Sequence, residues 1–458
     1  MNLKAVFRDI GIVLKYISPV FLLPVVAALI YGEYFTIVYF VLTFLPMFVI
    51  GSIFEKVFAT DEKTLLKEGL LTVALLWLMI TLAATIPYIC IEKITLLEAS
   101  FETMAAWTTT GFSLLVPEDL THTMLFYRSV QQWFGGVGIV VLALAGMFRT
   151  GASLYYAEAR TEKVRPNILN TIKMIWWIYA LYTIVGIVLL VFAGMTPFDA
   201  INHGMTSIAT AGLSTHSESI GYYNNPYIEF VIIILMITGS ISFLSHYELL
   251  LGKTKKFFSD VFVRSLFVFI IVGTLFVMKD KGSRSGLFTV VSAVSSTGYN
   301  LDTVGMWPDF SIFVLIVLML VGGCAGSTVS GIKINRIIIV VKSVFWSVNR
   351  LKSQSRVFSR KIGPVSYNDT LVCEVFKFIL LYFVFIMLGA FVFLHEGYEL
   401  KVSVFQSVSA IGNSGLSVMP EYTPLSMFTA IMLMWIGRLE IWAVITLFGY
   451  LMIKSKLR

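Results

Sequence analysis

The sequence predicts an all-α polytopic membrane protein in which two transmembrane helices precede four tandem repeats, each built as helix, short re-entrant loop and helix. Three observations predict this fold class: the composition, the length of the apolar runs, and a glycine-containing segment that occurs four times. Hydrophobic residues make up 57% of the chain and charged residues only 13%, well below the roughly 25% of soluble globular domains. A chain of this composition belongs in a lipid bilayer.

Ten apolar runs are long enough, or nearly long enough, to cross a membrane, which takes about 20 helical residues. They lie near residues 9–31, 34–53, 68–90, 126–148, 171–195, 228–251, 260–278, 310–346, 371–394 and 425–452. The first run is too long for the core of a signal peptide, lacks a small-residue cleavage site and leads directly into the second. We therefore expect it to be retained.

The net charge of +7 comes from basic residues whose positions indicate membrane topology rather than nucleic-acid binding. Alternate connections are rich in Lys and Arg, which marks the cytoplasmic side, and both termini fall on that side. The residues are Lys4, Arg8, Lys56, Lys63, Lys67, Arg149, Arg160, Lys163, Arg165, Lys253, Lys255, Lys256, the basic run in 350–361, Lys454, Lys456 and Arg458. Four basic residues on the other side weaken this bias without reversing it: Lys279, Lys281, Arg284 and Lys401.

Four segments between successive spans align on a glycine, at 101–113, 198–214, 288–300 and 405–417. Each begins with Phe, continues as a short amphipathic stretch and ends in a hydroxyl or small residue, Gly, a bulky apolar residue, and Ser or Asn. Because two spans separate successive segments, all four enter from the side opposite the basic connections. The predicted units are a helix pair at 1–60 and four parallel repeats at 61–160, 161–257, 258–363 and 364–458.

These segments are predicted to line a pore. Their backbone leaves polar groups unpaired, which a bilayer permits only where they face a watery cavity or pack inside protein. Carbonyl oxygens can replace the hydration shell of a cation, glycine supplies the backbone freedom, and the C-terminal ends of four short helices add negative partial charge. With no acidic residue at the aligned positions, a monovalent cation is favoured over Ca2+. The predicted filter residues are Thr109, Thr110, Gly111, Thr210, Ala211, Gly212, Ser296, Thr297, Gly298, Asn413, Ser414 and Gly415.

A glycine-rich break interrupts the apolar tract 307–342, which is too long for one straight span. Glycine costs about 1 kcal/mol per helical position relative to alanine, and the hydroxyl residues here compete for backbone hydrogen bonds. We expect an unwound loop just below the filter that plugs the pore. The GxxxG spacing of Gly322 and Gly326 leaves open a tight helix-packing face instead. The predicted gate residues in this tract are Gly322, Gly323, Gly326, Ser327, Gly331 and Lys333.

Arg438 lies near the middle of the last span, where a charge costs at least ~2.5 kcal/mol and normally faces a cavity or a partner. Two roles stay open: a barrier to cations beneath the filter, or an ion pair between helices. Glu440 is only two residues away and points to a different face of the helix, so the two side chains are not expected to neutralise each other within the helix. Arg128 is expected to anchor its span at the interface or at a pore helix.

Other functions are disfavoured by the residues. No paired carboxylates, Ser/His/Asp set or metal cluster falls in one polar site, so the chain is not expected to be an enzyme. The segment 326–333 resembles a P-loop, but Ile332 displaces the lysine and no Ser or Thr follows it, so nucleotide control would come from another chain. An H+- or Na+-coupled K+ symporter on the same frame is the alternative function, although such transporters usually carry inverted repeats.

Three further segments, 128–141, 322–333 and 437–440, together with the four loops, carry a resemblance over essentially the whole chain to the Trk/Ktr/HKT superfamily of K+ transporters. The two additional spans within 9–53 resemble its TrkH/TrkG branch. The resemblance implies a multi-pass protein of the plasma or inner membrane, surrounded by lipid, with no cofactor besides the transported K+. It also implies a homodimer in which each protomer has its own pore around a pseudo-fourfold axis, and a cytoplasmic TrkA-like ring that binds ATP, ADP or NAD.

The resemblance also bears on ion choice and gating. In plant relatives a serine at the first filter position is associated with Na+ preference, so Gly111 implies K+ selectivity, with Rb+ as a surrogate. Ala211 departs from the family pattern, in which a hydroxyl residue is usual. The resemblance favours a gate for the glycine-rich loop and places Arg438 beneath the filter.

Overall fold

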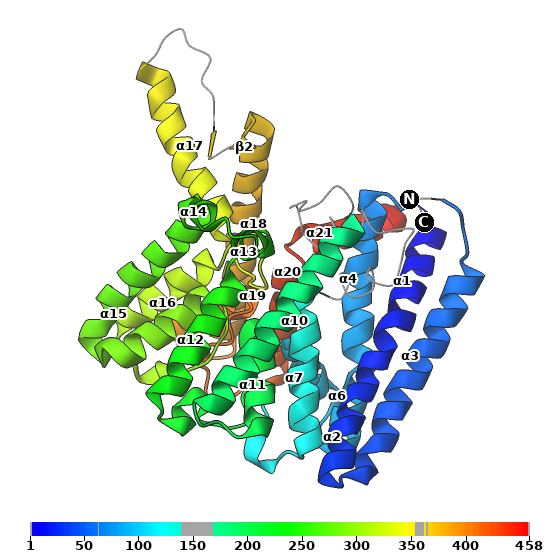
Figure 1. Cartoon of the computed structure of the whole chain (residues 1–458). Coiled ribbons are helices and arrows are strands. Elements are labelled where there is room, and N and C mark those ends of the chain that lie inside the picture. Colours follow the sequence, from blue (N-terminus) through cyan, green and yellow to red (C-terminus); the bar gives the residue numbers. More distant parts are fainter. Residues whose placement is uncertain (1, 63, 139–167, 353–360, 363–364, 457–458) are drawn as a thin grey trace.

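The structure, a computed structural model, describes residues 2–62, 64–138, 168–352, 361–362 and 365–456, and these are almost entirely helical. Several basic residues used above lie outside the described residues, namely Lys63, Arg149, Arg160, Lys163, Arg165, Arg458 and much of the run 350–361. A two-residue antiparallel pair, β1 (Lys361–Ile362) and β2 (Val365–Ser366), is the sheet in the described part. Both termini lie at the same end of the molecule (Figure 1).

The N-terminal helix pair consists of α1 (Leu3–Ile17), η1 (Ser18–Leu22) and α2 (Leu23–Tyr31), which run one way, and η2 (Tyr34–Thr36) and α3 (Ile37–Val57), which return. Two glycines let α1 and α3 approach closely. A Cβ placed on Gly11 would lie 2.6 Å from the Glu55 nitrogen, and one on Gly51 would lie 2.6 Å from the Lys15 nitrogen. Lys15 and Glu55 also form an ion pair (2.8 Å). Small residues at this crossing thus fix the pair.

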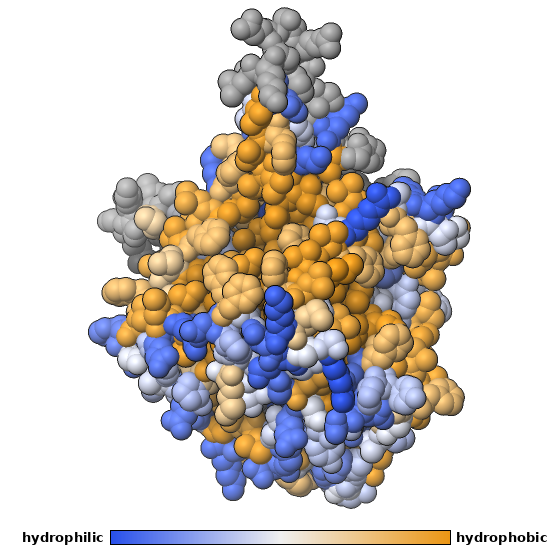
Figure 2. Space-filling model, turned by 90° about the vertical axis from the view of Figure 1, so that its left-hand side faces the viewer, coloured by the Kyte–Doolittle hydropathy of each residue, from blue (hydrophilic) through white to orange (hydrophobic). Residues whose placement is uncertain are grey.

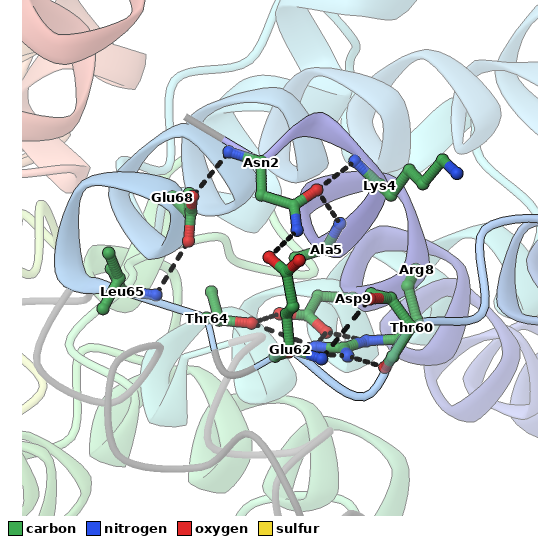
Figure 3. A network of polar contacts seen from close by, with 10 residues as sticks. All are labelled: Asn2, Lys4, Ala5, Arg8, Asp9, Thr60, Glu62, Thr64, Leu65 and Glu68. Atoms are coloured by element: carbon green, nitrogen blue, oxygen red, sulfur yellow. Dashed lines mark hydrogen bonds and ion pairs between the residues drawn. The ribbon is translucent and has the colours of Figure 1, made fainter.

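A polar network fastens the beginning of α1 to the connection between α3 and the next helix, α4 (Leu66–Ala83) (Figure 3). Asn2 caps α1 by accepting backbone hydrogen bonds from its first turn, and its own nitrogen donates to Glu68 Oε1 (2.6 Å). The fully buried Asp9 pairs with Arg8 (2.8 Å) and accepts a hydrogen bond from Thr64 Oγ1 (2.5 Å). Since a buried carboxylate is costly without partners, these bonds hold the network in one arrangement.

Four successive groups of helices follow, each containing a short helix between longer ones. The first has α4, α5 (Thr85–Ile91), α6 (Leu96–Trp107), η3 (Pro117–Asp119) and α7 (His122–Val137). The second has α10 (Ile168–Phe192), α11 (Pro197–Ile208), η4 (Ser219–Tyr223), α12 (Pro226–Ser240), α13 (Phe243–Leu250) and α14 (Thr254–Ser259). The third has α15 (Val261–Val294), η5 (Val304–Met306), α16 (Asp309–Val321) and α17 (Ile334–Lys352). The fourth has α18 (Asp369–His395), α19 (Leu400–Ile411), α20 (Pro424–Arg438) and α21 (Trp442–Lys456).

The short helices begin at identifiable signals. Thr95 caps α6 and forms a capping box with Glu98, and Thr196 caps α11 by accepting from the Asp199 nitrogen (3.2 Å). In the third group the short helix is the last part of α15, which is set off by a kink at Gly282 with a φ of 75°. The kink turns the chain back without a separate loop.

Each of the ten predicted spans contains a helix in the described residues, and six helices there are long and apolar enough to cross a membrane, or eight when two bent pairs are counted. The span predicted at 126–148 is described only to residue 138. The expected break within 310–346 is confirmed, because α16 ends at Val321 and α17 begins at Ile334. Two breaks were not predicted: α12 and α13 meet at 107°, and α20 and α21 meet at 111°.

The outer surface of the helices is apolar. On the side where α15 lies, Figure 2 shows a broad hydrophobic region above a hydrophilic end. Exposed side chains of α15 include Val268 (55%), Ile271 (57%) and Leu275 (57%). Contiguous exposed hydrophobic surface of this kind suits contact with lipid, as expected for a multi-pass membrane protein.

Candidate functional site

Four turns follow the short helices and have the same backbone conformation; we call them the glycine turns, at 108–112, 209–213, 295–299 and 412–416. In each, the residue two positions before the glycine has a positive φ, which is rare without a supporting environment. These residues are Thr109 (57°), Thr210 (50°), Ser296 (49°) and Asn413 (48°). The glycines, Gly111, Gly212, Gly298 and Gly415, have φ values of 84°, 80°, 92° and 79°.

A backbone hydrogen bond to the preceding short helix supports each turn. The residue before the glycine donates to the carbonyl five residues earlier, as in Thr110 to Ala105 (2.9 Å). The other three bonds run from Ala211 to Thr206 (3.0 Å), from Thr297 to Ser292 (2.9 Å) and from Ser414 to Ser409 (2.9 Å). Repetition of one bond in all four turns shows that the aligned sequences adopt one structure.

The four turns contact one another in a closed ring, since each glycine lies against a carbonyl oxygen of the next turn. A Cβ on the glycine would lie 2.6 Å or less from that oxygen, so a side chain would collide with the neighbouring backbone. The pairs are Gly111 with Ala211 O, Gly212 with Thr297 O, Gly298 with Ser414 O, and Gly415 with Thr110 O. The last pair joins the fourth turn to the first. All twelve residues predicted for the filter therefore lie together in this ring.

The glycines of the ring open onto two cavities, whereas their neighbours are buried. Each glycine is partly exposed, while the residues directly before and after it are buried. One cavity of about 330 Å³ is lined by Gly111, Gly212 and Gly298, and a second of about 550 Å³ by Gly111 and Gly415. The ring thus has an open approach from one side.

Ala211 keeps the common turn conformation despite its missing hydroxyl, because its contacts run through the backbone. Its carbonyl accepts a hydrogen bond from Gln132 Nε2 (2.7 Å), and Gln132 Oε1 accepts from the Leu213 nitrogen (3.1 Å). Gln132 lies on α7 and is fully buried. Gln132 was not among the predicted site residues, and its one signal in the sequence is its place in the segment that begins at Arg128.

The loop between α16 and α17, residues 322–333, lies directly under the second turn, and we call it the glycine-rich loop. Thr328 Oγ1 is 3.0 Å from Thr210 Oγ1 and donates to the Gly239 carbonyl (2.9 Å). The Cys324 nitrogen donates to the Ser240 carbonyl (2.9 Å). The bend between α12 and α13 frees these two carbonyls for the loop, which accounts for a break that the sequence did not predict.

Arg438 lies at the end of α20, near the middle of the predicted span 425–452, and the chain there bends sharply into α21. Its guanidinium donates to Thr109 Oγ1 (3.1 Å) in the first turn. It also donates to the Thr328 carbonyl (3.1 Å) and Ser330 Oγ (3.3 Å) in the glycine-rich loop. At the end of α7 the acceptors are the carbonyls of Gly135 and Gly136. Arg438 therefore joins the first turn of the ring to the glycine-rich loop and to the end of α7.

Glu440 forms ion pairs with Lys333 and Arg336, at the junction of the glycine-rich loop and α17. The negative charge of Glu440 is thus neutralised from another segment, in agreement with the expectation that it does not pair with Arg438 within the helix. The glycine-rich loop, Arg438 and Glu440 line a polar cavity of about 30 Å³. Little space is left between these described residues beneath the ring.

These helices define the class of protein: an α-helical, multi-pass membrane protein whose glycine turns meet in a ring. The sequence profile of the TrkH family, described as "Cation transport protein", matches residues 40–278 and 261–457. The chain belongs to the TrkH family of cation transport proteins, so the expected resemblance is confirmed, as is the expectation of a transport protein rather than an enzyme.

Relatives resemble the chain over nearly its whole length. An uncharacterized cation transporter of Methanocaldococcus jannaschii is 36% identical over 99% of this chain and 97% of its own. The Trk system potassium uptake protein TrkH of Escherichia coli K12 is 33% identical, with coverage of 98% and 99%. The crystal structure of the potassium transporter TrkH from Vibrio parahaemolyticus superposes with a TM-score of 0.86 at 28% identity, covering 98% of both chains.

Proposed function

We propose that this chain is the ion-conducting transmembrane subunit of a potassium uptake system, passing K+ and its surrogate Rb+ through the ring of glycine turns. The observation that carries the proposal is the closed contact of Gly111, Gly212, Gly298 and Gly415 with successive carbonyls. Carbonyl oxygens held at fixed separation can replace the water shell of a cation. The names of the Escherichia coli and Vibrio relatives support K+ as the transported ion.

The proposed architecture places the pore on a pseudo-fourfold axis through the ring. Its units are the helix pair 1–60 and the repeats 61–160, 161–257, 258–363 and 364–458. The filter is formed by the twelve ring residues, with no bound cofactor besides the transported ion. Its outer cavities face the cell exterior, and both termini lie in the cytoplasm.

The proposed gate is the glycine-rich loop together with Arg438. Arg438 places a positive charge where a cation would leave the ring, and the loop leaves little free volume there. Glycines at 322, 323, 326 and 331 allow the loop to change conformation, and Lys333 and Glu440 hold it closed. Since Lys333 directly precedes α17, a movement of α17 would be transmitted to the loop.

Control of this gate is proposed to come from a cytoplasmic, TrkA-like ring that binds ATP, ADP or NAD, acting on a homodimer of this chain. Support comes from the relatives, which are named as parts of Trk systems, and from α17, which projects from the end that carries both termini (Figure 1). A partner bound at that end would reach the helix that adjoins the gate.

The proposal is tested by flux in liposomes that contain the purified protein, with and without the co-purified cytoplasmic ring. We expect 86Rb+ uptake driven by a K+ gradient, and a reversal potential that follows K+ alone. Gly212→Val should abolish uptake, because a Cβ there meets Thr297 O at 1.9 Å, whereas Gly252→Val, with no atom within 4 Å, should not. No uptake by the wild type would refute the proposal. A reversal potential that shifts with pH or Na+ would favour the coupled symporter.

A further inference from the structure

Two further positions, outside the filter residues, can be aligned in all four turns, and we call them the second register. Nine positions before each glycine, on the short helix, stand Glu102, His203, Thr289 and Gln406. Two positions after each glycine stand Ser113, Ser214, Asn300 and Ser417. In three of the four turns these two positions are joined by a hydrogen bond: Ser113 to Glu102 (3.1 Å), Ser214 with His203 Nε2 (3.0 Å), and Ser417 to Gln406 Oε1 (3.2 Å). We call each such pair a brace.

The brace of the first turn is ionic. Glu102 is 1% exposed and accepts hydrogen bonds from the Leu114 nitrogen (2.5 Å) and from Ser113. Arg128, on α7 and 2% exposed, donates to Ser113 Oγ (2.7 Å) and approaches Glu102 Oε2 to 3.8 Å. Arg128 is therefore an anchor of the short helix α6, one of the two roles expected from the sequence. Ser113 itself lines both outer cavities.

The braces of the other turns involve no ion pair, and one turn has no brace. His203 Nδ1 is 2.9 Å from the Asp199 carbonyl, which can only accept, so Nδ1 carries the proton and Nε2 accepts from Ser214. In the third turn, Thr289 Oγ1 is buried without a hydrogen-bond partner in the described part of the chain. There the Gly298 nitrogen donates to Ser292 Oγ instead (3.1 Å). A charge thus supports the first turn, whereas the third turn has no brace.

We propose that Glu102, Ser113 and Arg128 are positioning residues that hold the first turn at the separation needed to prefer K+ over Na+. The proposal rests on the proposed filter function. A carbonyl cage discriminates between ions only while its oxygens keep their spacing. Glu102 and Arg128 are buried, and their charge-assisted hydrogen bonds are stronger than neutral ones, so they restrain the strand beyond Gly111 more tightly. Because Glu102 is almost wholly buried, it acts on the ion through the backbone rather than by contact.

Two variants weaken the brace in different ways. Glu102→Gln copies the residue that occupies the same register in the fourth turn, and Ser113→Ala removes the hydroxyl that both Glu102 and Arg128 contact. The matched control is Thr289→Val, which removes a hydroxyl of the same register that has no partner. Because both variants replace charge-assisted hydrogen bonds by weaker contacts or by none, we expect the K+ over Na+ permeability ratio to fall by at least about threefold in both and to stay unchanged in the control.

Permeability ratios are measured from reversal potentials in liposomes, beside 86Rb+ uptake as the measure of conduction. Unchanged ratios in Glu102→Gln and Ser113→Ala, or an equal fall in Thr289→Val, would overturn the proposal. Glu102→Gln can fail to fold, since it removes the carboxylate that faces Arg128. If this variant is not recovered from membranes, Ser113→Ala is the test, because the Ser113 side chain faces a cavity and its removal disturbs folding less. A wild type that passes no Rb+ would refute the proposed function rather than the brace.

Discussion

The guanidinium of Arg438 lies 3.1 Å from the hydroxyl of Thr109, and it joins the end of α20 to the first turn of the ring. Thr109 has a positive φ, so this hydrogen bond helps to hold a backbone conformation that is costly on its own. The same guanidinium binds the glycine-rich loop through the Thr328 carbonyl. One side chain thereby couples the proposed filter to the proposed gate.

Arg438→Ala is expected to raise K+ leak through the protein. A unit charge about 4 Å from a cation opposes it by about 4 kcal/mol at an effective dielectric constant of about 20, so flux should rise by at least about tenfold. The measurement is 86Rb+ uptake into liposomes without the regulatory ring. Lys401→Ala, which removes a surface charge paired with Asp309, serves as the control and should have no effect. Equal flux in Arg438→Ala and the wild type would contradict the barrier role.

Gly111→Ser is expected to reduce K+ over Na+ selectivity. A Cβ at this position would lie 2.2 Å from Ala211 O, so the first and second turns must move apart and the carbonyl spacing must change. The permeability ratio should fall by roughly tenfold, which corresponds to about 1.4 kcal/mol. Gly32→Ser is the matched control, because Gly32 has a φ of 73° and, among the residues that the structure describes, no atom lies within 4 Å of its Cβ position. It carries the same backbone strain without the collision, and a comparable loss of selectivity there would argue against the ring as the filter.

Thr328→Val is expected to loosen the glycine-rich loop. The substitution keeps the shape of the side chain but removes its hydrogen bonds to Thr210 and Gly239, each worth about 0.5–1.5 kcal/mol. Flux in the absence of the regulatory ring should rise about threefold to tenfold. Thr446→Val is the control for replacing threonine by valine, since within the described part of the chain the Thr446 hydroxyl bonds only the Trp442 carbonyl of its own helix. If the leak of Thr328→Val equals that of the wild type, the hydrogen bonds of Thr328 do not hold the gate closed.

The sequence predicted the ring residues because the requirement they meet is local. A position with a positive φ and a close neighbour accepts only glycine, so a glycine recurs in the sequence at Gly111 and its three counterparts. The residues that support the turns come from distant segments, and no such repeated residue identifies them in the sequence. Gln132 lies on α7 yet binds Ala211 of the next unit, and its contact depends on how two helices pack.

The bend after Arg438 was also outside what the sequence could predict. Bends usually occur at proline or glycine, but here Glu440 and Ile441 adopt positive φ values of 52° and 62°. Glu440 is held by ion pairs with Lys333 and Arg336, and this tertiary environment overrides the local preference for a straight helix. The apolar run 425–452 has the length of a single span, and the sequence gives no sign that two helices meet within it at 111°.

Gly51→Ala is expected to destabilise the N-terminal helix pair. A Cβ at Gly51 would lie 2.6 Å from the Lys15 nitrogen, and overpacking of this kind typically costs 1–3 kcal/mol. Gly449→Ala is the matched substitution on α21, where no atom of the described residues lies within 4 Å of the Cβ position, and alanine there should stabilise the helix by up to about 1 kcal/mol. The measurement is the thermal unfolding midpoint of the purified protein in detergent. We expect the midpoint to fall for Gly51→Ala and to hold or rise for Gly449→Ala; the opposite order would mean that α1 and α3 are not packed through Gly11 and Gly51.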